Sequence, residues 1–287
     1  KAKPETLMKW PSPWGVGFPG WHIECSAMSK KYLGDTFDIH GGGMDLQATH
    51  HTNEIAQSKA CSKHEPVKYW IHTNMLTVNG VRMSKTAGNG FLPNELFTGS
   101  HPLLVKGYAP MVVRFFMLQA HYRSTLDFSN EALQASEKGL KKLMQGIQTL
   151  KKINPSPNSS VEILKIKEDC YRAMNDDFNS PMVISNLFEA VRIINSAHDN
   201  KETLTQSDIS LLQKLFDDFV FMILGLKDET ADVAGQSIDG LMQLILSLRQ
   251  QAKNNKDFAT SDQIRDELIK MGILVKDTKT GATWSME

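Results

Sequence analysis

Residues 37–57, FDIHGGGMDLQATHHTNEIAQ, carry the pattern that decides the fold. FDIHGGG reads as a strand that runs into three glycines, and the Ala, Ile and Gln around HHTNE make the following stretch a plausible helix. Glycines at such a junction let a nucleotide approach the backbone closely, or simply permit a tight turn. The stretch matches neither G-x-G-x-x-G nor the Walker A pattern. Strand, glycine turn and helix in this order indicate an α/β sheet domain.

Two residues of the expected helix are candidates for a site. His50 and Glu54 are four positions apart, so on a regular helix their side chains lie on one face, one turn apart, whereas His51 points to another face. Such a pair is either a surface pair worth a few tenths of a kcal/mol or part of a metal-ligand set. The pair alone favours the surface pair, and a metal site needs further residues.

Outward from this stretch, the chain divides into three parts that differ in predicted secondary structure. Strand-like runs such as YWIHTNMLTV alternate with helical ones such as HIECSAMSKKYL through residues 1–108, whereas helical periodicity dominates residues 109–234. Residues 154–161, NPSPNSSV, predict a loop within the helical part, and residues 227–240 a polar linker. Two short helices and a hairpin turning at Thr280-Gly281 are expected in residues 235–287. The expected fold is therefore α/β, then a helical bundle, then a small C-terminal α+β domain.

Composition limits the function classes. The chain has 287 residues, 41% hydrophobic and 22% charged, with a formal net charge of zero, so any polyanion has to be bound by a local patch. No apolar run approaches the ~20 residues that span a bilayer, and the first residues lack the apolar segment of a signal peptide, so we expect a cytoplasmic protein without a membrane partner. Three widely spaced cysteines argue against a disulfide framework and for reduced thiols or a metal ligand.

Two further stretches carry reactive side chains. GWHIECSAM, residues 20–28, places Cys25 near Trp21 and His22, although a single cysteine is usually a small buried hydrophobic residue. VRMSKTAGNG, residues 81–90, is a loop of small residues in which Lys85 can reach an anionic ligand, or which simply forms a mobile surface loop. Neither stretch is specific by itself.

In their order and spacing, GWHIECSAM, HGGGMDL running into HHTNEIAQS, and RMSKTAGN resemble the second half of a class I aminoacyl-tRNA synthetase, specifically of the cysteinyl family. The resemblance implies a Rossmann-type catalytic domain. It also implies that the loop, K-M-S-K-S in the family, binds the ATP phosphates through its second lysine, here Lys85. Arg82 replaces the first lysine and Thr86 the last serine, and Ser84 keeps its place. Arg82, Ser84 and Lys85 are thereby implied as catalytic residues, although Arg is not a free substitute for Lys.

The same resemblance implies which residues bind the ribose of ATP. The family's G-x-D element falls on Gly43 and Asp45, which implies contacts to the ribose of ATP. A carboxylate that accepts ribose hydroxyls is physically reasonable at the mouth of a parallel sheet. ATP is expected to arrive with Mg²⁺.

The family binds one zinc ion with two cysteines, a histidine and a glutamate. Cys25, His50 and Glu54 fall on three of these positions, and the fourth ligand, a cysteine, is absent from this sequence. The resemblance implies that the zinc ion ligates the thiolate of the substrate cysteine, which a serine hydroxyl cannot imitate. The ligands are thus also substrate-binding residues, together with Trp21, which either packs beside the amino acid or is a core aromatic residue.

Two features of the family pattern are missing from this sequence. An H-I-G-H-type motif and the second zinc cysteine, which the family carries in its N-terminal half, are missing, so we expect this chain to be a C-terminal piece of a longer enzyme that is inactive alone. Cys61 and Cys170 do not match the missing ligand and are interpreted as structural thiols. Residues 98–110 are longer than the family's usual connection and have no functional explanation.

The later segments resemble the tRNA-binding parts of the family. HYRSTLDFSNEAL and YRAMNDDFNSPMVISNLFEAV resemble its connecting segment and anticodon-stem bundle, and residues 256–284 resemble its anticodon-binding domain. The residues implied as anticodon contacts are Lys253, Phe258, Asp262, Arg265 and Asp277. Asp262 and Arg265, three apart, are alternatively a helix surface pair. The lysines of residues 138–152 either attract a tRNA stem or form a solvated face.

The resemblance therefore implies a cysteine-tRNA ligase fragment that acts on L-cysteine, ATP and tRNA(Cys), in a monomeric enzyme. Three alternatives stay open. The chain is a tRNA-binding, non-catalytic module, or a zinc hydrolase, which the lack of an H-E-x-x-H arrangement disfavours, or a related ligase that joins cysteine to a glucosamine-inositol acceptor, which the C-terminal domain disfavours.

Overall fold

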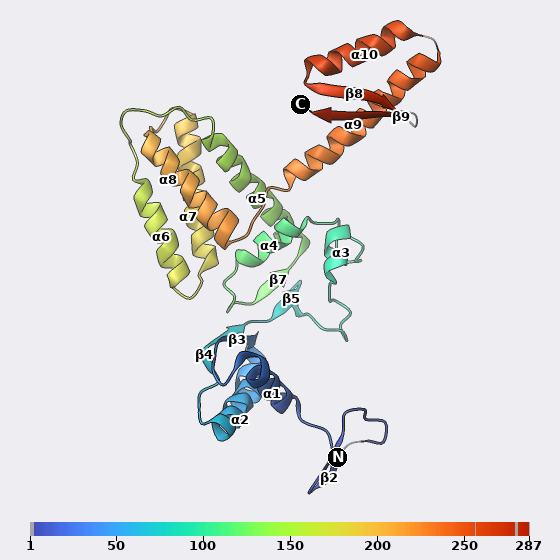
Figure 1. Ribbon diagram of the computed structural model, residues 1–287. Helices are drawn as coiled ribbons and strands as arrows, with labels where there is room; N and C mark the ends of the chain where they lie inside the picture. Colours follow the sequence, from blue (N-terminus) through green and yellow to red (C-terminus); the bar gives the residue numbers. More distant parts are fainter. Residues whose placement is uncertain (1–2, 256, 279–280, 287) are drawn as a thin grey trace. The chain divides into compact units, whose positions relative to one another are not determined.

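The computed structural model describes residues 3–255, 257–278 and 281–286. Within these ranges only the backbone is described for residues 230–240, 276–278, 281, 283 and 285–286. The chain forms two compact units, residues 1–226 and residues 227–287, and each is described here by itself (Figure 1). No helix of the described residues is both long enough and apolar enough to cross a membrane.

The first unit begins with an α/β part that fits the expectation from FDIHGGG. Its elements are β1 (Trp10–Ser12), β2 (Gly15–Gly17), α1 (Trp21–Leu33), β3 (Phe37–Gly43), η1 (Met44–Leu46), η2 (Gln47–His51), α2 (Thr52–Ser62) and β4 (Val67–Thr73). β3 and β4 are parallel and run in register from Phe37 beside Val67 to Gly43 beside Thr73. α1 and α2 pack against each other. The glycines close β3 at the carboxyl end of this parallel pair, the edge at which α/β folds bind ligands.

A second small sheet follows. It consists of β5 (Leu76–Val78), β6 (Val81–Arg82) and β7 (Leu126–Phe128), with β5 in the middle, antiparallel to β6 and parallel to β7. Between β6 and β7 lie α3 (Pro93–Thr98) and α4 (Pro110–Leu118). Residues 98–110, which had no explanation from the sequence, are packed into this part, with the Tyr108 ring buried.

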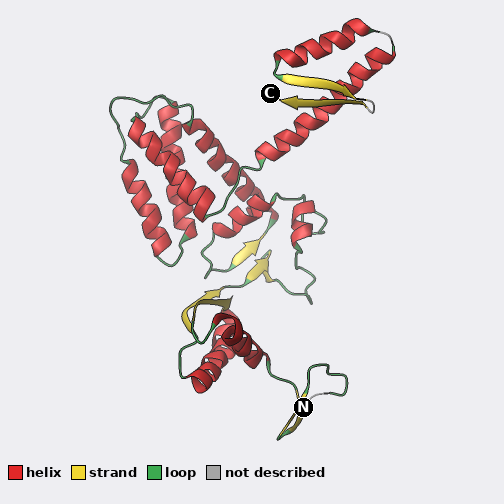
Figure 2. Ribbon diagram, in the orientation of Figure 1, coloured by secondary structure: helices red, strands yellow, loops and turns green. Residues whose placement is uncertain are grey.

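The expected helical bundle is formed by α5 (Asn130–Leu150), α6 (Ile163–Asn175), α7 (Ser180–His198), α8 (Gln206–Phe216) and η3 (Asp217–Ile223) (Figure 2). The apolar residues of α5 recur at helical spacing, and Leu133, Leu140, Leu143 and Leu150 are buried for that reason. The predicted loop at residues 154–161 is observed between α5 and α6. One apolar cluster runs from Val78 to Leu226 and unites the bundle with the second sheet.

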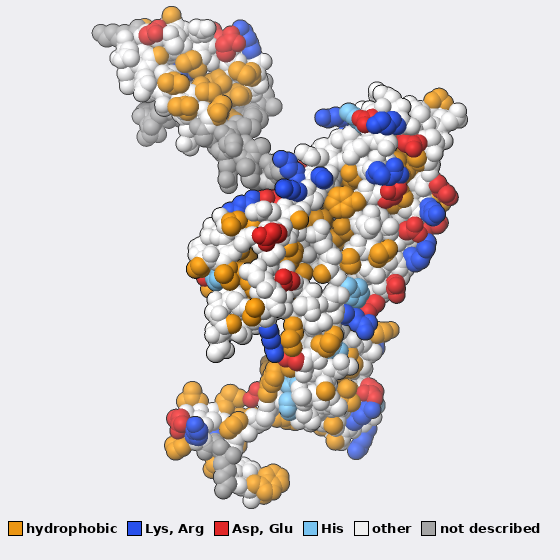
Figure 3. Space-filling view, turned by 180° about the vertical axis from the view of Figure 1, so that it is seen from behind, with side chains coloured by type: hydrophobic (Ala, Val, Ile, Leu, Met, Phe, Trp, Pro, Cys, Tyr) orange, Lys and Arg blue, Asp and Glu red, His pale blue; other side chains and the backbone are white. Residues whose placement is uncertain are grey.

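The α/β part lacks such a core. Among the described residues before Val67, the buried residues are His50, His51, Glu54 and Pro66, so one proline is the only buried apolar residue there. Large apolar side chains are instead exposed on this part, including Trp14, Tyr32 and Ile39, and Figure 3 shows hydrophobic side chains gathered on its surface. The interior of the α/β part is therefore polar and centred on histidines.

The second unit contains α9 (Thr230–Asn254), α10 (Phe258–Lys270), β8 (Ile273–Thr278) and β9 (Gly281–Met286). β8 and β9 form the predicted hairpin, whose turn at residues 279–280 lies outside the described residues. The prediction of a linker over residues 227–240 was wrong, because α9 continues through most of it. Residues 230–254 contain no proline, and polar residues alone do not end a helix.

Candidate metal and nucleotide site

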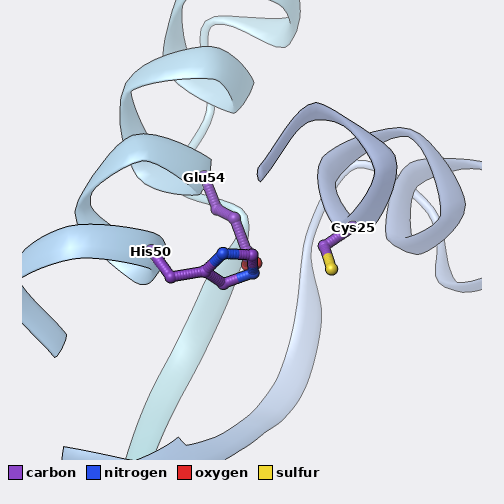
Figure 4. A group of neighbouring side chains, drawn as sticks. All are labelled: Cys25, His50 and Glu54. Atoms are coloured by element: carbon purple, nitrogen blue, oxygen red, sulfur yellow. The ribbon is translucent and has the colours of Figure 1, made fainter. Parts of the chain in front are cut away.

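Three elements bring together one thiol, one imidazole and one carboxylate. Cys25 lies in α1, His50 is the last residue but one of η2, and Glu54 is in the first turn of α2. The candidate ligand atoms of these three side chains all lie within 4.8 Å of one another. Figure 4 shows the imidazole and the carboxylate side by side, with the thiol facing them from the other helix.

The contact between His50 and Glu54 has the distance of a strong interaction without the geometry of a hydrogen bond. His50 Nε2 lies 2.6 Å from Glu54 Oε1, yet Glu54 Oε1 is buried with no hydrogen-bond partner among the described groups. His40 Nδ1, 3.5 Å from Glu54 Oε2, is buried and unpaired in the same sense. Buried polar atoms are normally paired. Two unpaired polar atoms close together therefore indicate the site of a cation such as a metal ion.

Around this trio lies a histidine cluster that sequence reasoning missed. His40, His51 and Glu54 form a second group whose candidate ligand atoms lie within 4.8 Å of one another. His51 Nδ1 and His72 Nε2 are 2.8 Å apart, and the Trp70 ring lies 4.7 Å from the His51 ring. Polar rings thus fill the space that an apolar core occupies elsewhere.

The prediction that His51 points away from the pair was wrong. His51 is as buried as His50, and its candidate ligand atom lies within 4.8 Å of that of Glu54. The reason is local, because Gln47–His51 forms one π-helical turn before α2 begins, and the wider turn shifts the faces expected from 3.6 residues per turn.

Burial sets the protonation of this cluster. It lowers the pKa of His50, with His22 nearby adding to the effect, and it lowers the pKa of His51 to about 4, with His40 and His72 contributing. Both imidazoles are therefore neutral at pH 7, the form that binds metals. Burial also raises the pKa of Glu54 and, followed by the charge of Glu54, that of Cys25. A bound dication reverses such shifts for acidic ligands.

These residues fit a zinc ion. One thiolate, one imidazole and one carboxylate are ligand types that Zn²⁺ accepts, and the orphaned Glu54 Oε1 supplies an independent sign of a missing cation. His22 Nδ1 lies 2.6 Å from His50 Nδ1, so one of these two nitrogens carries the proton and the other accepts it. Such a partner orients a ligand imidazole from its second nitrogen.

Trp21 is the first residue of α1 and lies over the site. Its ring centroid is 4.0 Å from that of His50, and the side chain is 57% exposed. The alternative of a core aromatic residue does not hold, because the indole faces outward beside the candidate ligands. Its open face is available to a small molecule.

The glycine turn places Asp45 at the end of β3. A Cβ added to Gly43 would lie 2.5 Å from Asp45 Oδ1, so the carboxylate occupies space that only glycine leaves free. Gly43 is paired with Thr73 at the carboxyl ends of the parallel strands. Gly43 and Asp45 are thus brought together at the edge where a nucleotide would be expected.

The loop of residues 81–90 has a built interior. Asn89 is buried, accepts a hydrogen bond from Ser84 N at 2.9 Å, and donates to the backbone carbonyls of Val81 and Arg82. Ser84 Oγ accepts from Ala87 N. Arg82 and Lys85 are exposed on this loop. The side chain of Asn89 therefore ties both ends of the loop together and leaves the cationic groups outside.

Three family models match the chain. Residues 1–138 match the class I (C) tRNA synthetase catalytic domain, residues 170–226 the DALR domain, and residues 242–284 the cysteinyl-tRNA ligase anticodon binding domain. Cysteine–tRNA ligases from Parabacteroides distasonis and Porphyromonas gingivalis are 55% and 53% identical over 99% of this chain. The chain belongs to the cysteinyl-tRNA synthetase family.

The family match has a defined extent. The chain spans 58% of the length of the P. distasonis relative and 59% of the P. gingivalis relative. The solved LeuRS-tRNA-LeuAMS ternary complex from Agrobacterium radiobacter superposes with a TM-score of 0.53, over 76% of this chain and 33% of that one, at 14% identity. This likeness supports the class I fold.

The residues predicted to contact the anticodon differ in their exposure and in their partners. Phe258, the first residue of α10, is 62% exposed, and Arg265 Nη1 lies 3.1 Å from Asp262 Oδ1 on the same helix. Lys253 lies in the last turn of α9. Asp277 lies in β8, and its side chain is outside the described residues. The surface-pair alternative for Asp262 and Arg265 thus describes this structure, and their anticodon role stays a prediction.

The two other cysteines differ from each other. Cys170 in α6 is fully buried, and burial raises the pKa of its thiol to about 12, as suits a structural residue. Cys61 is exposed, with its Sγ 3.7 Å from Lys30 Nζ. The interpretation as a structural thiol therefore holds for Cys170 and not for Cys61.

The missed histidines had a signal in the sequence. Of nine histidines, six lie between residues 22 and 72: His22, His40, His50, His51, His64 and His72. Five of these six, all but His64, take part in the cluster. Their density along the chain was the available clue, but only the fold shows which of them meet.

Proposed function

We propose that this chain acts in cysteine–tRNA ligation. In this reaction ATP activates L-cysteine to cysteinyl adenylate, and the acyl group is then transferred to tRNA(Cys). The observation that carries the proposal is the convergence of Cys25, His50 and Glu54 on one buried point, beside the glycine turn of a parallel strand pair. Because the chain spans 58% of the P. distasonis relative, the activity is proposed for the protein completed by the corresponding N-terminal part.

The nucleotide is held by two separate groups of residues. Asp45, at the carboxyl end of β3, accepts hydrogen bonds from the ribose hydroxyls, and Gly43 gives its carboxylate the room to do so. Lys85, Arg82 and Ser84 face the phosphates from the loop of residues 81–90. The carboxylate of cysteine attacks the α-phosphorus, pyrophosphate leaves, and the Lys85 ammonium offsets the charge that develops on it.

The amino acid is held at the histidine cluster. Cys25, His50 and Glu54 would hold a zinc ion, which when bound supplies a soft electrophilic position for the thiolate of substrate cysteine. Trp21 covers this position from the side of α1, and His22 orients the His50 ring. A serine hydroxyl is harder and far less acidic than a thiol, so the same residues discriminate against serine.

The second unit and the bundle are the proposed tRNA-binding parts. Phe258 offers an exposed ring for stacking, and Lys253, Asp262, Arg265 and Asp277 are the proposed polar contacts to anticodon bases. An alternative function, as a tRNA-binding module without catalysis, rests on the match of residues 242–284 to an anticodon binding domain. It predicts tRNA binding in the absence of any cysteine-dependent reaction.

Cysteine-dependent ATP–pyrophosphate exchange tests the proposal. The assay is run with cysteine or serine on this chain alone and on the chain joined to the N-terminal part of the P. distasonis relative, with the zinc content of both measured. We expect exchange only in the joined protein and only with cysteine. Lys85→Ala should lower the exchange rate about 10²–10³-fold, whereas Lys165→Ala, at an exposed lysine of α6, should not change it.

Two results would decide against the proposal. A folded, zinc-loaded joined protein without exchange leaves the tRNA-binding module as the function, provided that the chain binds tRNA. Exchange that is equally fast with serine contradicts the assignment of Cys25, His50 and Glu54 to amino-acid selection.

A further inference from the structure

Two segments that the proposed reaction does not use meet at one aspartate. Asp177 lies in the corner between α6 and α7, and the segment His121–Tyr122–Arg123 lies between α4 and β7. Tyr122 Oη donates to Asp177 Oδ1 at 2.5 Å, and Arg123 Nη1 donates to Asp177 Oδ2 at 3.0 Å. His121 Nε2 donates to the backbone carbonyl of Asp177 at 3.1 Å. Three successive side chains therefore bind one residue more than fifty positions away.

The imidazole in this contact is oriented by a second bond. Arg123 N donates to His121 Nδ1 at 3.3 Å, so Nδ1 accepts and Nε2 carries the proton that goes to Asp177. The hydrogen bond from Tyr122, followed by that from Arg123, holds the pKa of Asp177 below its usual range. Asp177 is thus an ionised acceptor whose oxygens are both engaged.

The backbone at this corner is strained. Asp177 and Phe178 have φ angles of 56° and 55°, two successive non-glycine residues in the left-handed region. A non-glycine residue is sterically disfavoured in this region, so the arrangement persists only where surrounding contacts determine it. Aspartate tolerates this region better than most residues, but the half-exposed Phe178 does not.

The same segment, residues 121–123, is also bound by the residue that follows β4, the strand that carries His72. Asn74 follows β4 directly, its backbone N–H donates to Tyr122 O at 2.9 Å, and its Nδ2 donates to Arg123 O at 2.9 Å. Two positions before it, His72 contacts His51. Asn74, the segment and Asp177 thus form a continuous connection from the candidate metal site to the helical bundle.

We propose that Asp177, Tyr122 and Arg123 form a clasp that fixes the helical bundle relative to the histidine cluster, and that this clasp is needed for transfer of cysteine to tRNA but not for activation of cysteine. This role rests on the proposed function, in which the bundle carries the tRNA stem. The clasp residues are positioning residues. A shift of about 1 Å between a reacting group and its partner costs about 10²-fold in rate, so a loosened bundle slows the step that needs tRNA.

The chain offers a clean variant and a matched control. Asp177→Gly removes both acceptor oxygens and suits the left-handed φ, so it adds no backbone strain. Glu189→Gln removes the exposed ion pair between Glu189 and Arg192 on α7, whose exposure, 47% and 61%, resembles that of Asp177 and Arg123, 41% and 63%. The control therefore breaks a comparable pair away from the junction.

The first measurement compares two rates in the joined protein described above. We expect Asp177→Gly to slow single-turnover transfer to tRNA(Cys) about tenfold or more while ATP–pyrophosphate exchange changes less than about twofold. Glu189→Gln should change neither rate. Adding Arg123→Met to Asp177→Gly should slow transfer no further, because the two groups act through one contact. Equal losses in both rates, or no loss in transfer, would overturn the proposal.

The second measurement needs no enzymatic activity and uses this chain alone, loaded with zinc to protect Cys25. Spin labels on the native, exposed Cys61 in α2 and on Gln213→Cys in α8 report the distance between the two parts. We expect a narrow distribution that Asp177→Gly broadens and Glu189→Gln leaves unchanged. A distribution that is already broad without substitution, or that Asp177→Gly does not change, contradicts the clasp. Absence of exchange in the unsubstituted joined protein would instead count against the proposed function.

Discussion

At the scale of single residues, Glu54 is the centre of the molecule's polar interior. Its two oxygens face His50 and His40, and the Cys25 thiol lies in reach of the same carboxylate. The sequence identified Cys25, His50 and Glu54 through a family pattern, and spacing alone supported only the pair of His50 and Glu54. His40 and His51 were beyond spacing arguments, because one comes from a strand and the other from a π-helical turn.

Gly42 allows the histidine cluster to close. A Cβ at this position would lie 2.6 Å from His51 Cε1, whereas a Cβ at Gly41 would find its nearest neighbour, Ile71 O, at 3.8 Å. We expect Gly42→Ala to lower the free energy of unfolding by about 1–3 kcal/mol, since His51 has to move against its neighbours. Gly41→Ala is the control with little change. Urea denaturation and zinc content measure both effects, and equal behaviour of the two variants would exclude the packing argument.

The three thiols should differ in reactivity. Cys61 is exposed, whereas Cys170 is fully buried with the pKa of its thiol raised to about 12, so almost none of it is thiolate at pH 8. We expect iodoacetamide to modify Cys61 first and Cys170 only when the bundle unfolds. Peptide mass spectrometry against time measures this, with urea-unfolded chain as the control. Modification of Cys170 at the rate of Cys61 would show that the bundle core is open.

At the scale of elements, the presence of the bundle helices was more predictable than the start of α9. The bundle helices follow from apolar spacing, and the start of α8 has a capping box in which the Thr205 side chain accepts from Asp208 N and Asp208 accepts from Thr205 N. α9 is the counter-example. Its first part was assigned to a linker on polarity, although nothing in residues 230–254 ends a helix.

The capping box of α8 gives a prediction for stability. Thr205→Ala should cost about 1 kcal/mol of unfolding free energy, because it leaves the backbone N–H of Asp208 without its acceptor. Thr149→Ala is the control, since the Thr149 hydroxyl only bonds back to Gln145 O within α5. Thermal denaturation at pH 7 measures the difference. Equal melting temperatures of the two variants would show that water replaces the cap.

The same box predicts a pH dependence. Burial raises the pKa of the Asp208 carboxyl, but the hydrogen bonds from Thr205 outweigh burial and hold this pKa below its usual value of 3.8. A lowered folded-state pKa means that the stabilisation is present above the unfolded value and is lost as the pH falls through the lowered value. The penalty of Thr205→Ala should therefore shrink in acid. A penalty that is constant from pH 7 to pH 3 would contradict this.

At the scale of the whole molecule, the two parts of the first unit are stabilised differently. The bundle has a continuous apolar core, whereas the described residues before Val67 bury only His50, His51, Glu54 and Pro66. Apolar burial contributes about 25 cal/mol per Å², and this part receives little of it. Its order therefore depends on the polar cluster and on the ion proposed for it.

Removal of zinc should act on one part only. We expect a chelator to make residues 3–66 sensitive to protease while residues 130–226 stay protected, because a metal site stabilises the fold that holds its ligands. Limited proteolysis with mass mapping and metal analysis measures this. Cys25→Ala should give the sensitive pattern without chelator. Loss of zinc with an unchanged cleavage pattern would mean that the ion does not stabilise this part.

The sequence by itself determined the alternation of elements, the bundle helices, and the family pattern that singles out Cys25, His50, Glu54 and Lys85, because periodicity and local motifs are properties of neighbouring residues. Only the tertiary structure decided which histidines meet, that Asp45 lies against Gly43, and that Tyr122 and Arg123 bind Asp177. The histidine contacts and the contacts of Asp177 join segments far apart in the chain, and the position of Asp45 depends on the backbone path of the turn after β3. No local pattern encodes a distance through space.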